Sequence, residues 1–290
     1  MKAILEAQGN YMPRSTRTIW KVLTSHQRIH RPPKVEHEVM DRPAPDEEWG
    51  IDFKDVSSAA PQPEGKQAHV IEILNVVDHG SSALVDTHID ADFNAESALL
   101  AVADILRTHG CPKRIRIRDP RWVGSSSGKD FPSALLRFLV AVGIEPIVCP
   151  PQRPDKNPFV ERYHRNLKYE CLLRSCPQDL QTTHQVNQAY AHHYNFERPS
   201  QAITCQNQPP RVAFPYSLTL PRLPQVVDPD SWLSKFHDQC YKRRVDCNGR
   251  IQIGKQRYYV NKKLAGRYVI IRINGQEEGR THKIVGYTSS

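Results

Sequence analysis

The stretch K-R-I-R-I-R-D-P-R-W-V-G-S-S-S-G-K-D-F spans Lys113–Phe131 and carries two acids in different settings. Ile115 and Ile117 alternate with arginines, which is the two-residue period of a strand buried on one face. This strand ends at Asp119, so we expect that acid at an edge of a sheet. A Ser- and Gly-rich segment with little strand propensity follows, which predicts a loop, and Asp130 stands near its end. We expect Asp130 to begin the next helix.

The neighbouring segments predict the rest of a mixed α/β fold. Alternating and β-branched runs predict strands at 49–56, 68–77, 82–89, 113–118 and 145–149. Capped, Ala- and Leu-rich runs predict helices at 94–109, 133–142, 158–173 and 180–195. Three strands followed by alternating helices and strands indicate a mixed sheet with helices packed against it.

The C-terminal part has a different character. After a Pro-rich connector at 199–229, β-branched and aromatic runs from 241 to 287 are broken by Asn-Gly and Gly turns, which predicts a small β-barrel. Residues 240–290 hold twelve Lys/Arg and three acids, so they carry the whole formal net charge of +9. A basic module beside a neutral remainder indicates a polyanionic partner, with nucleic acid first.

The N-terminal 35 residues hold seven Lys/Arg and one acid, and a short helix is expected at 15–23. The segment 31–48 has four prolines and no apolar period, which predicts a linker. No apolar run approaches the roughly 20 residues of a membrane span, and no signal-peptide pattern is present. Seven cysteines without a C-x-x-C pair favour a reducing compartment. We therefore expect a cytoplasmic protein without a membrane partner.

Three acids stand out by their placement. Asp52 alternates with apolar neighbours in the first strand, Asp119 ends the fourth, and Glu161 lies one turn into the helix that follows the fifth. Each alone fits a solvated or capping acid. Together they supply three oxygen ligands from adjacent elements, which suits Mg²⁺. Arg165 and Lys168 share a helix face with Glu161, either as an ordinary ion pair or as cations that hold a phosphate backbone.

Three short motifs resemble those of a known family. Trp49-x-x-Asp52, Asn157-x-x-x-Glu161-Arg162 and Tyr194-Asn195-x-x-Arg198-Pro199 are similar in order and spacing to landmarks of the integrase-type DDE transposases. That family includes retroviral integrases and bacterial insertion-sequence transposases. The resemblance covers about 48–200, and it implies an RNase H-like mixed sheet flanked by helices. It also implies a partial helix-turn-helix at 1–30, a linker at 31–47, a connector at 201–235 and a small SH3-like β-barrel at 236–290.

The resemblance implies chemistry as well. Asp52, Asp119 and Glu161 would bind two Mg²⁺ or Mn²⁺ ions and support transposon-end 3′ cleavage and strand transfer into target DNA by direct phosphoryl transfer. The partner would be double-stranded DNA, bound by a homo-oligomer in the bacterial cytoplasm at the nucleoid. The expected DNA-binding residues come from the N-terminal helix, the catalytic helix and the barrel, namely Arg14, Arg17, Lys21, Arg165, Lys168, Lys242, Arg243, Arg244, Arg257, Lys262 and Lys263.

The second carboxylate departs from the family pattern. The family has Asp-Asn-Gly-x-Glu-Phe there, whereas this chain has Asp119-Pro120-Arg121, and Gly128-Lys129-Asp130-Phe131 resembles the displaced second half. An ungapped alignment would put Ser126 at the acid's position, which would leave the enzyme inactive. The strand geometry favours Asp119, with Asp130 as the alternative.

Two other functions stay open. One is a truncated or repurposed transposase that binds DNA without catalysis, because the chain starts close to the helix that would end the upstream domain. The other is an RNase H-like nuclease that acts by hydrolysis alone.

Overall fold

The computed structural model describes residues 16–26, 42–57, 69–118, 124–125, 128–150, 156–215, 219–253, 256–275 and 282–288. The chain divides into two units, Met1–Asp41 and Arg42–Ser290. In the first unit, helix α2 (Thr16–Ser25) confirms the short helix that the sequence predicts. The helix-turn-helix assignment stays a prediction. None of the helices within the described ranges is long and apolar enough to cross a membrane.

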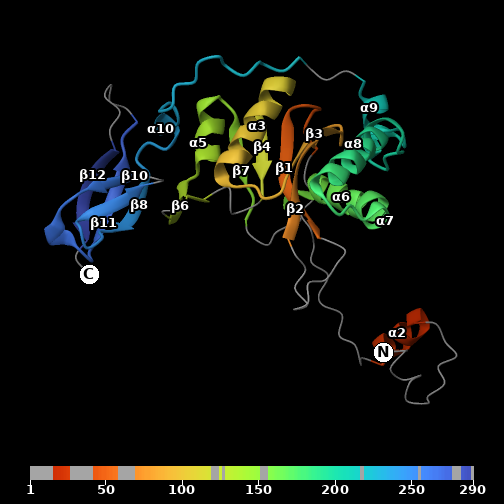
Figure 1. Ribbon diagram of the computed structural model, residues 1–290, viewed down its shortest axis with the longest axis horizontal. Coiled ribbons are helices and arrows are strands. Elements are labelled where there is room, and N and C mark those ends of the chain that lie inside the picture. The colour runs from red at the N-terminus through yellow and green to blue at the C-terminus, as the bar shows by residue number, and fades with distance from the viewer. Residues whose placement is uncertain are drawn as a thin grey trace. The chain divides into compact units, whose positions relative to one another are not determined.

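A five-stranded mixed sheet forms the centre of the second unit, in the order β3-β2-β1-β4-β7 (Figure 1). Its strands are β1 (Glu48–Ser57), β2 (His69–Asp78), β3 (Leu84–Asp90), β4 (Arg114–Ile117) and β7 (Glu145–Val148). The first three pair antiparallel as a meander, whereas β4 pairs parallel with both β1 and β7. The predicted mixed sheet is confirmed, and β1 lies at the junction between its antiparallel and parallel halves.

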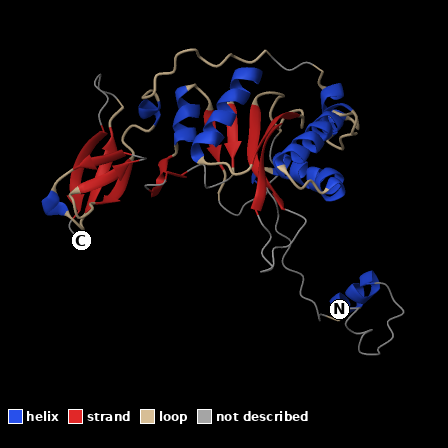
Figure 2. Cartoon of the chain, in the orientation of Figure 1, coloured by secondary structure: helices blue, strands red, loops and turns tan. Residues whose placement is uncertain are grey.

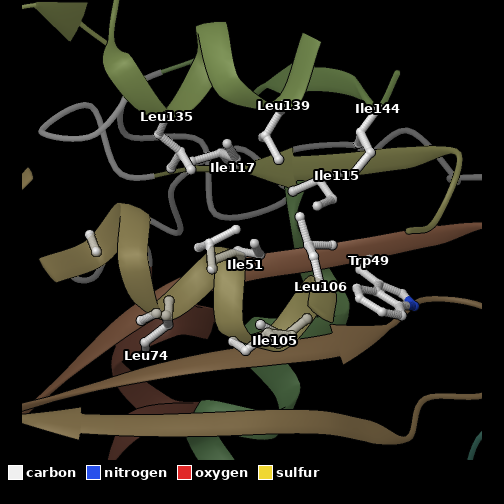
Figure 3. Packing of buried hydrophobic residues seen from close by; sticks show 14 of the residues in the cluster. Trp49, Ile51, Leu74, Ile105, Leu106, Ile115, Ile117, Leu135, Leu139 and Ile144 are labelled. Atoms are coloured by element: carbon white, nitrogen blue, oxygen red, sulfur yellow. The ribbon is translucent and has the colours of Figure 1, made fainter. Parts of the chain in front are cut away.

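Helices cover both faces of this sheet, as the blue ribbons on either side of the red strands show (Figure 2). On one face, α3 (Ala95–His109) and α5 (Ala134–Ala141) pack their apolar sides on alternate residues of β1 and β4. Trp49, Ile51, Ile115 and Leu139 lie in this core (Figure 3). Alternation therefore points Asp52 to the other face of β1.

On that other face, one irregular helix and one long helix pack against β1, β2 and β3. The first consists of α6 (Pro158–Asn166), the π-helical turn η2 (Leu167–Leu172) and α7 (Leu173–Ser175), and the second is α8 (Leu180–Phe196). Val160, Tyr163 and Leu167 are buried against Ile71 and Ile73 of β2. The sequence predicts this helix at 158–173 but gives no sign of its π-helical turn.

A short hairpin of β5 (Gly124–Ser125) and β6 (Gly128–Pro132) precedes α5. Asp130 lies inside β6, so the expectation that it begins a helix is wrong. Ser133 is the N-cap of α5, and its hydroxyl accepts a hydrogen bond from the Leu136 N–H. Pro132, whose ring fixes φ, and the buried Phe131 hold the chain extended up to that cap.

The connector contains three short helices, η3 (Ile203–Cys205), α9 (Pro210–Ala213) and α10 (Trp232–Lys235). Beyond it, β8 (Cys240–Arg244), β11 (Tyr268–Ile273) and β12 (His282–Thr288) form one antiparallel sheet, and β9 (Arg250–Ile253) pairs with β10 (Gln256–Tyr259) in another. The turn η4 (Lys262–Leu264) lies between β10 and β11. Both sheets contribute to one apolar cluster. The strands that the sequence predicts are present, but as two small sheets, and the described residues do not establish a closed barrel.

Candidate active site

Two of the predicted carboxylates meet at one cation. Asp52 is 3% exposed on β1, and Glu161 is on the first turn of α6. The guanidinium of Arg118, the residue after β4, lies between them: its Nη2 is 3.0 Å from Asp52 Oδ2, and its Nη1 pairs with Glu161 Oε1. Asp119 lies outside the described residues. The described backbone of this segment ends at Arg118.

A buried histidine that the sequence analysis missed stands beside Asp52. His164 follows Glu161 by one helical turn, and its Nδ1 lies 3.8 Å from Asp52 Oδ2. Burial, with nearby Lys54 and Arg118, lowers the pKa of His164 to about 3, so the ring is neutral at pH 7. Asn75 Nδ2 lies 3.0 Å from Nε2 and can only donate there, which leaves the ring proton on Nδ1, toward Asp52.

A series of hydrogen bonds through two side-chain amides and one hydroxyl holds the His164 ring at its Nε2 side. The Thr87 hydroxyl on β3 donates to Asn75 Oδ1 at 3.1 Å, and Asn187 Nδ2 on α8 donates to that hydroxyl at 3.0 Å. This series therefore crosses from α8 through β3 and β2 to α6. A histidine three residues after the helical acid was the one sign of this arrangement in the sequence.

A second buried network holds the start of α6. His79 lies between Glu48 and Asn157, with Nδ1 3.1 Å from Glu48 Oε1 and Nε2 3.1 Å from Asn157 Oδ1. Asn157 is the N-cap residue of α6. A Cβ on Gly50 would lie only 2.4 Å from His79 Nε2 and 2.6 Å from Asn157 Oδ1. A glycine at position 50 thus allows α6, and Glu161 with it, to approach β1.

A basic groove of about 550 Å³ opens beside Glu161. Glu161 and His164 of the site line the groove together with four cations, a proline and a tyrosine. The lining residues are Lys54, Pro158, Glu161, Arg162, His164, Arg165, Lys168 and Tyr169. The turn η2 carries Lys168 and Tyr169, and π-helical turns change the direction in which side chains leave a helix. Arg165 of α6 and Lys168 of η2, which the sequence places on the face of Glu161, line the same groove as that acid.

Residues 142–210, which include α6, η2, α8 and the groove residues from Pro158 to Tyr169, match a family model described as "Integrase core domain". This part of the chain is thus similar to an integrase core domain. An uncharacterised 39.2 kDa protein of insertion element IS476 from Xanthomonas euvesicatoria is 24% identical over 185 residues, which are 63% of this chain and 49% of that protein. The match thus spans about half the length of that relative.

Solved structures are also similar to the chain. The simian T-cell lymphotropic virus intasome in complex with PP2A regulatory subunit B56 gamma has a TM-score of 0.48 at 13% identity, over 99% of this chain and 92% of that chain. The HTLV-2 integrase catalytic core domain in complex with magnesium has a TM-score of 0.40 at 15% identity, over 59% of this chain and 97% of that chain.

The motif Tyr194-Asn195-x-x-Arg198-Pro199 has a structural role in this fold. Asn195 binds the backbone of Leu84 twice, accepting from its N–H at 3.0 Å and donating to its carbonyl at 2.9 Å. Arg198 holds Glu170 of η2 with two hydrogen bonds of 2.7 and 2.8 Å. The motif therefore docks α8 onto β3 and onto the turn that carries the groove residues.

The other predicted DNA-binding residues divide by exposure. Arg17 and Lys21 are exposed on α2, and Arg14 lies outside the described residues. Of the predicted residues in the C-terminal part, Lys242, Arg244 and Arg257 are exposed on strands, and Lys262 and Lys263 are exposed on the turn η4. Arg243 is the exception, because it is 6% exposed and its guanidinium lies over the rings of Phe131 and Tyr241. Its position inside the apolar cluster argues against the direct DNA contact that the sequence suggests.

Proposed function

We propose that this chain is a DNA transposase of the integrase type, a metal-dependent polynucleotidyl transferase that cleaves transposon 3′ ends and joins them to target DNA. The observation that carries the proposal is the convergence of Asp52 and Glu161 on one cation, from two different elements and beside a basic groove. An ion pair that only stabilised the fold would not require a basic groove beside it. It would also not require the buried Glu48–His79–Asn157 network that holds the start of α6.

The donor set suits Mg²⁺ or Mn²⁺. Both carboxylates supply oxygen ligands, which these ions prefer, and the Arg118 guanidinium shows that a positive charge is accommodated between them. Within the described ranges there is no group of three His, Cys, Asp or Glu side chains that could hold an ion. We propose Asp119 as the third ligand, because it follows Arg118 directly. When bound, two such ions would activate the attacking hydroxyl and stabilise the leaving oxygen.

The remaining residues would bind and orient the DNA. The cations of the groove, Lys54, Arg162, Arg165 and Lys168, would hold the phosphate backbone of the reacting strand so that one phosphate lies at Glu161. Neutral His164 keeps a ring N–H directed at Asp52 without adding a charge. The exposed cations of α2 and the C-terminal sheets would bind further along the duplex, in a homo-oligomer that bridges two DNA ends.

A strand-transfer assay tests this proposal. Duplexes taken from either side of the reading frame that encodes the chain would be nicked to expose a 3′-hydroxyl and incubated with supercoiled plasmid and Mg²⁺ or Mn²⁺. We expect joined products with the wild type, and a loss of at least about a hundredfold with Asp52→Asn or Glu161→Gln, because electrostatic stabilisation of the reacting phosphate is lost.

The same assay distinguishes the alternatives. Asp119→Asn and Asp130→Asn form a matched pair, and loss of joining with the second change alone would assign the third ligand to Asp130. Cleavage of plasmid without joining would favour a hydrolytic nuclease. DNA binding without any metal-dependent product, unchanged by Asp52→Asn, would favour a non-catalytic DNA-binding protein.

A further inference from the structure

Arg118, which follows β4, differs from the two arginines of that strand in its ion-pair partners. Arg114 and Arg116 on β4 pair with Glu47 and Glu48, away from the carboxylate site. Arg118 turns instead to the site, where it joins Asp52 of β1 to Glu161 of α6. One guanidinium thus links the two elements that supply the carboxylates, and it uses one oxygen of each.

The charge balance of the site explains why a cation stands there. Asp52 is 3% exposed, and a buried carboxylate is costly unless a positive charge compensates it. The side chain of Arg118 is 29% exposed, so it reaches Asp52 from the solvent side of the site and has a path outward.

We propose that Arg118 is a positioning residue that holds Asp52 and Glu161 together before metal binds and that metal must displace. The inference rests on the proposed metal site, because a divalent ion there would bind oxygens of the same two carboxylates that pair with Arg118. A carboxylate oxygen that pairs closely with a guanidinium is not free to coordinate an ion, so the two cations compete. The free energy of metal binding to the site is then less favourable by the free energy needed to break the ion pair with Arg118.

Manganese titration of the full chain without DNA tests the proposal. Isothermal titration calorimetry would compare the wild type with Arg118→Gln, Arg118→Lys and Arg114→Gln. We expect Arg118→Gln to bind Mn²⁺ at least about fivefold more tightly, a coupling of ordinary size. Arg118→Lys should fall between, because it keeps the charge but loses the planar fork. Arg114→Gln, the same charge change four residues earlier on the strand, should stay within about twofold of the wild type.

Thermal unfolding supplies a second readout and a check on folding. Without metal, Arg118→Gln should unfold at a lower temperature than the wild type, and saturating Mn²⁺ should raise its melting temperature by more than it raises that of the wild type. A purely structural role would lower the melting temperature without tightening the metal. If Arg118→Gln proves too unstable to titrate, Arg118→Lys carries the same comparison.

The outcomes separate the two proposals. Equal Mn²⁺ affinity in the wild type and Arg118→Gln would overturn competition by Arg118 and leave the metal site standing. Equal tightening by Arg118→Gln and Arg114→Gln would also overturn it, since the effect would then be one of general charge. If neither the wild type nor Arg118→Gln binds Mn²⁺ in a way that Asp52→Asn abolishes, the metal site of the proposed function fails as well.

Discussion

A single buried glutamate shows how charge constrains the start of β1. Glu48 is 4% exposed, and burial alone would raise the pKa of its carboxyl. Hydrogen bonds with His79 and Arg116 outweigh burial and lower that pKa from 4.5 to about 2. The carboxylate therefore joins β4, through its arginines, to the turn that carries His79, and through that turn to the N-terminus of α6.

The lowered pKa of Glu48 predicts a pH dependence of stability. A carboxyl whose folded pKa lies below its unfolded value stabilises the fold above the unfolded value of 4.5, and this stabilisation is lost as the pH falls toward about 2. We expect Glu48→Gln to lower the free energy of unfolding at pH 6 by about 3 kcal/mol. The difference from the wild type should shrink steadily between pH 4.5 and pH 3.

Urea unfolding at pH 6, 4 and 3 measures this difference. Asp104→Asn is a suitable control, because Asp104 is half exposed and pairs with Arg107 on the surface of α3. A difference between the wild type and Glu48→Gln that stays constant with pH would contradict the prediction.

At the scale of elements, the joint between α8 and η2 depends on one ion pair. Arg198, which follows α8, binds Glu170 with two hydrogen bonds, and the Tyr190 hydroxyl donates to the same carboxylate at 3.1 Å. The hydrogen bonds from Arg198 lower the pKa of Glu170. Because η2 carries Lys168 and Tyr169, this pair also holds one wall of the basic groove.

A double-mutant cycle on Arg198→Gln and Glu170→Gln should give a coupling of about 1 kcal/mol. Bidentate geometry makes the pair stronger than a typical surface pair, whereas the partial exposure of both side chains weakens it. The cycle is measured by urea unfolding, with Arg165→Gln as a control that is exposed in the groove and should change stability by less than about 0.5 kcal/mol. Zero coupling would show that the motif does not dock α8 through this pair.

The elements that the sequence predicts correctly are those with a strong period or a cap. Asn94, Ser133 and Gly110 bound helices close to where the pattern places them, and the alternation around Asp52 gives its face correctly. The π-helical turn was missed because its residues have the apolar spacing of an ordinary helix. The position of Asp130 was wrong because a Gly- and Ser-rich segment has low strand propensity, and pairing with β5 overrides it.

The sequence predicts which acids form the site, but it does not predict the side chains that pair with them. The motifs select Asp52 and Glu161, but the partner Arg118 follows β4, Asn75 lies within β2, and His164 shares α6 with Glu161 without being part of a motif. Nothing in a linear pattern tells which of the arginines at 114, 116 and 118 faces the acids. That depends on the register of β4 against β1, which only the folded sheet sets.

At the scale of the whole molecule, the excess positive charge is on the C-terminal sheets, yet not every cation there can meet DNA. Along β8 the side chains alternate between exposed and buried, so Lys242 and Arg244 face solvent while Arg243 points inward. Phe131 of β6 lies in the same apolar cluster as Tyr241 and Trp232, and the Arg243 guanidinium lies over its ring. Arg243 thus contributes to the packing of the C-terminal sheets on the hairpin that precedes α5.

These alternating residues predict two separable effects from the same change of charge. The proposed DNA contacts imply that Lys242→Gln with Arg244→Gln weakens DNA binding, and that the slope of log K against log salt falls by about 1.8, since each phosphate contact contributes about 0.9. Arg243→Gln should leave the slope within about 0.3 of the wild type, because that side chain is buried, and should instead lower the free energy of unfolding by about 1–3 kcal/mol.

Fluorescence anisotropy with a labelled duplex between 50 and 200 mM salt measures the slopes, and urea unfolding measures the stability. A slope that falls with Arg243→Gln as much as with Arg244→Gln alone would mean that Arg243 leaves the rings of Phe131 and Tyr241 to bind DNA. DNA binding would then disrupt the packing of the C-terminal sheets on the β5–β6 hairpin.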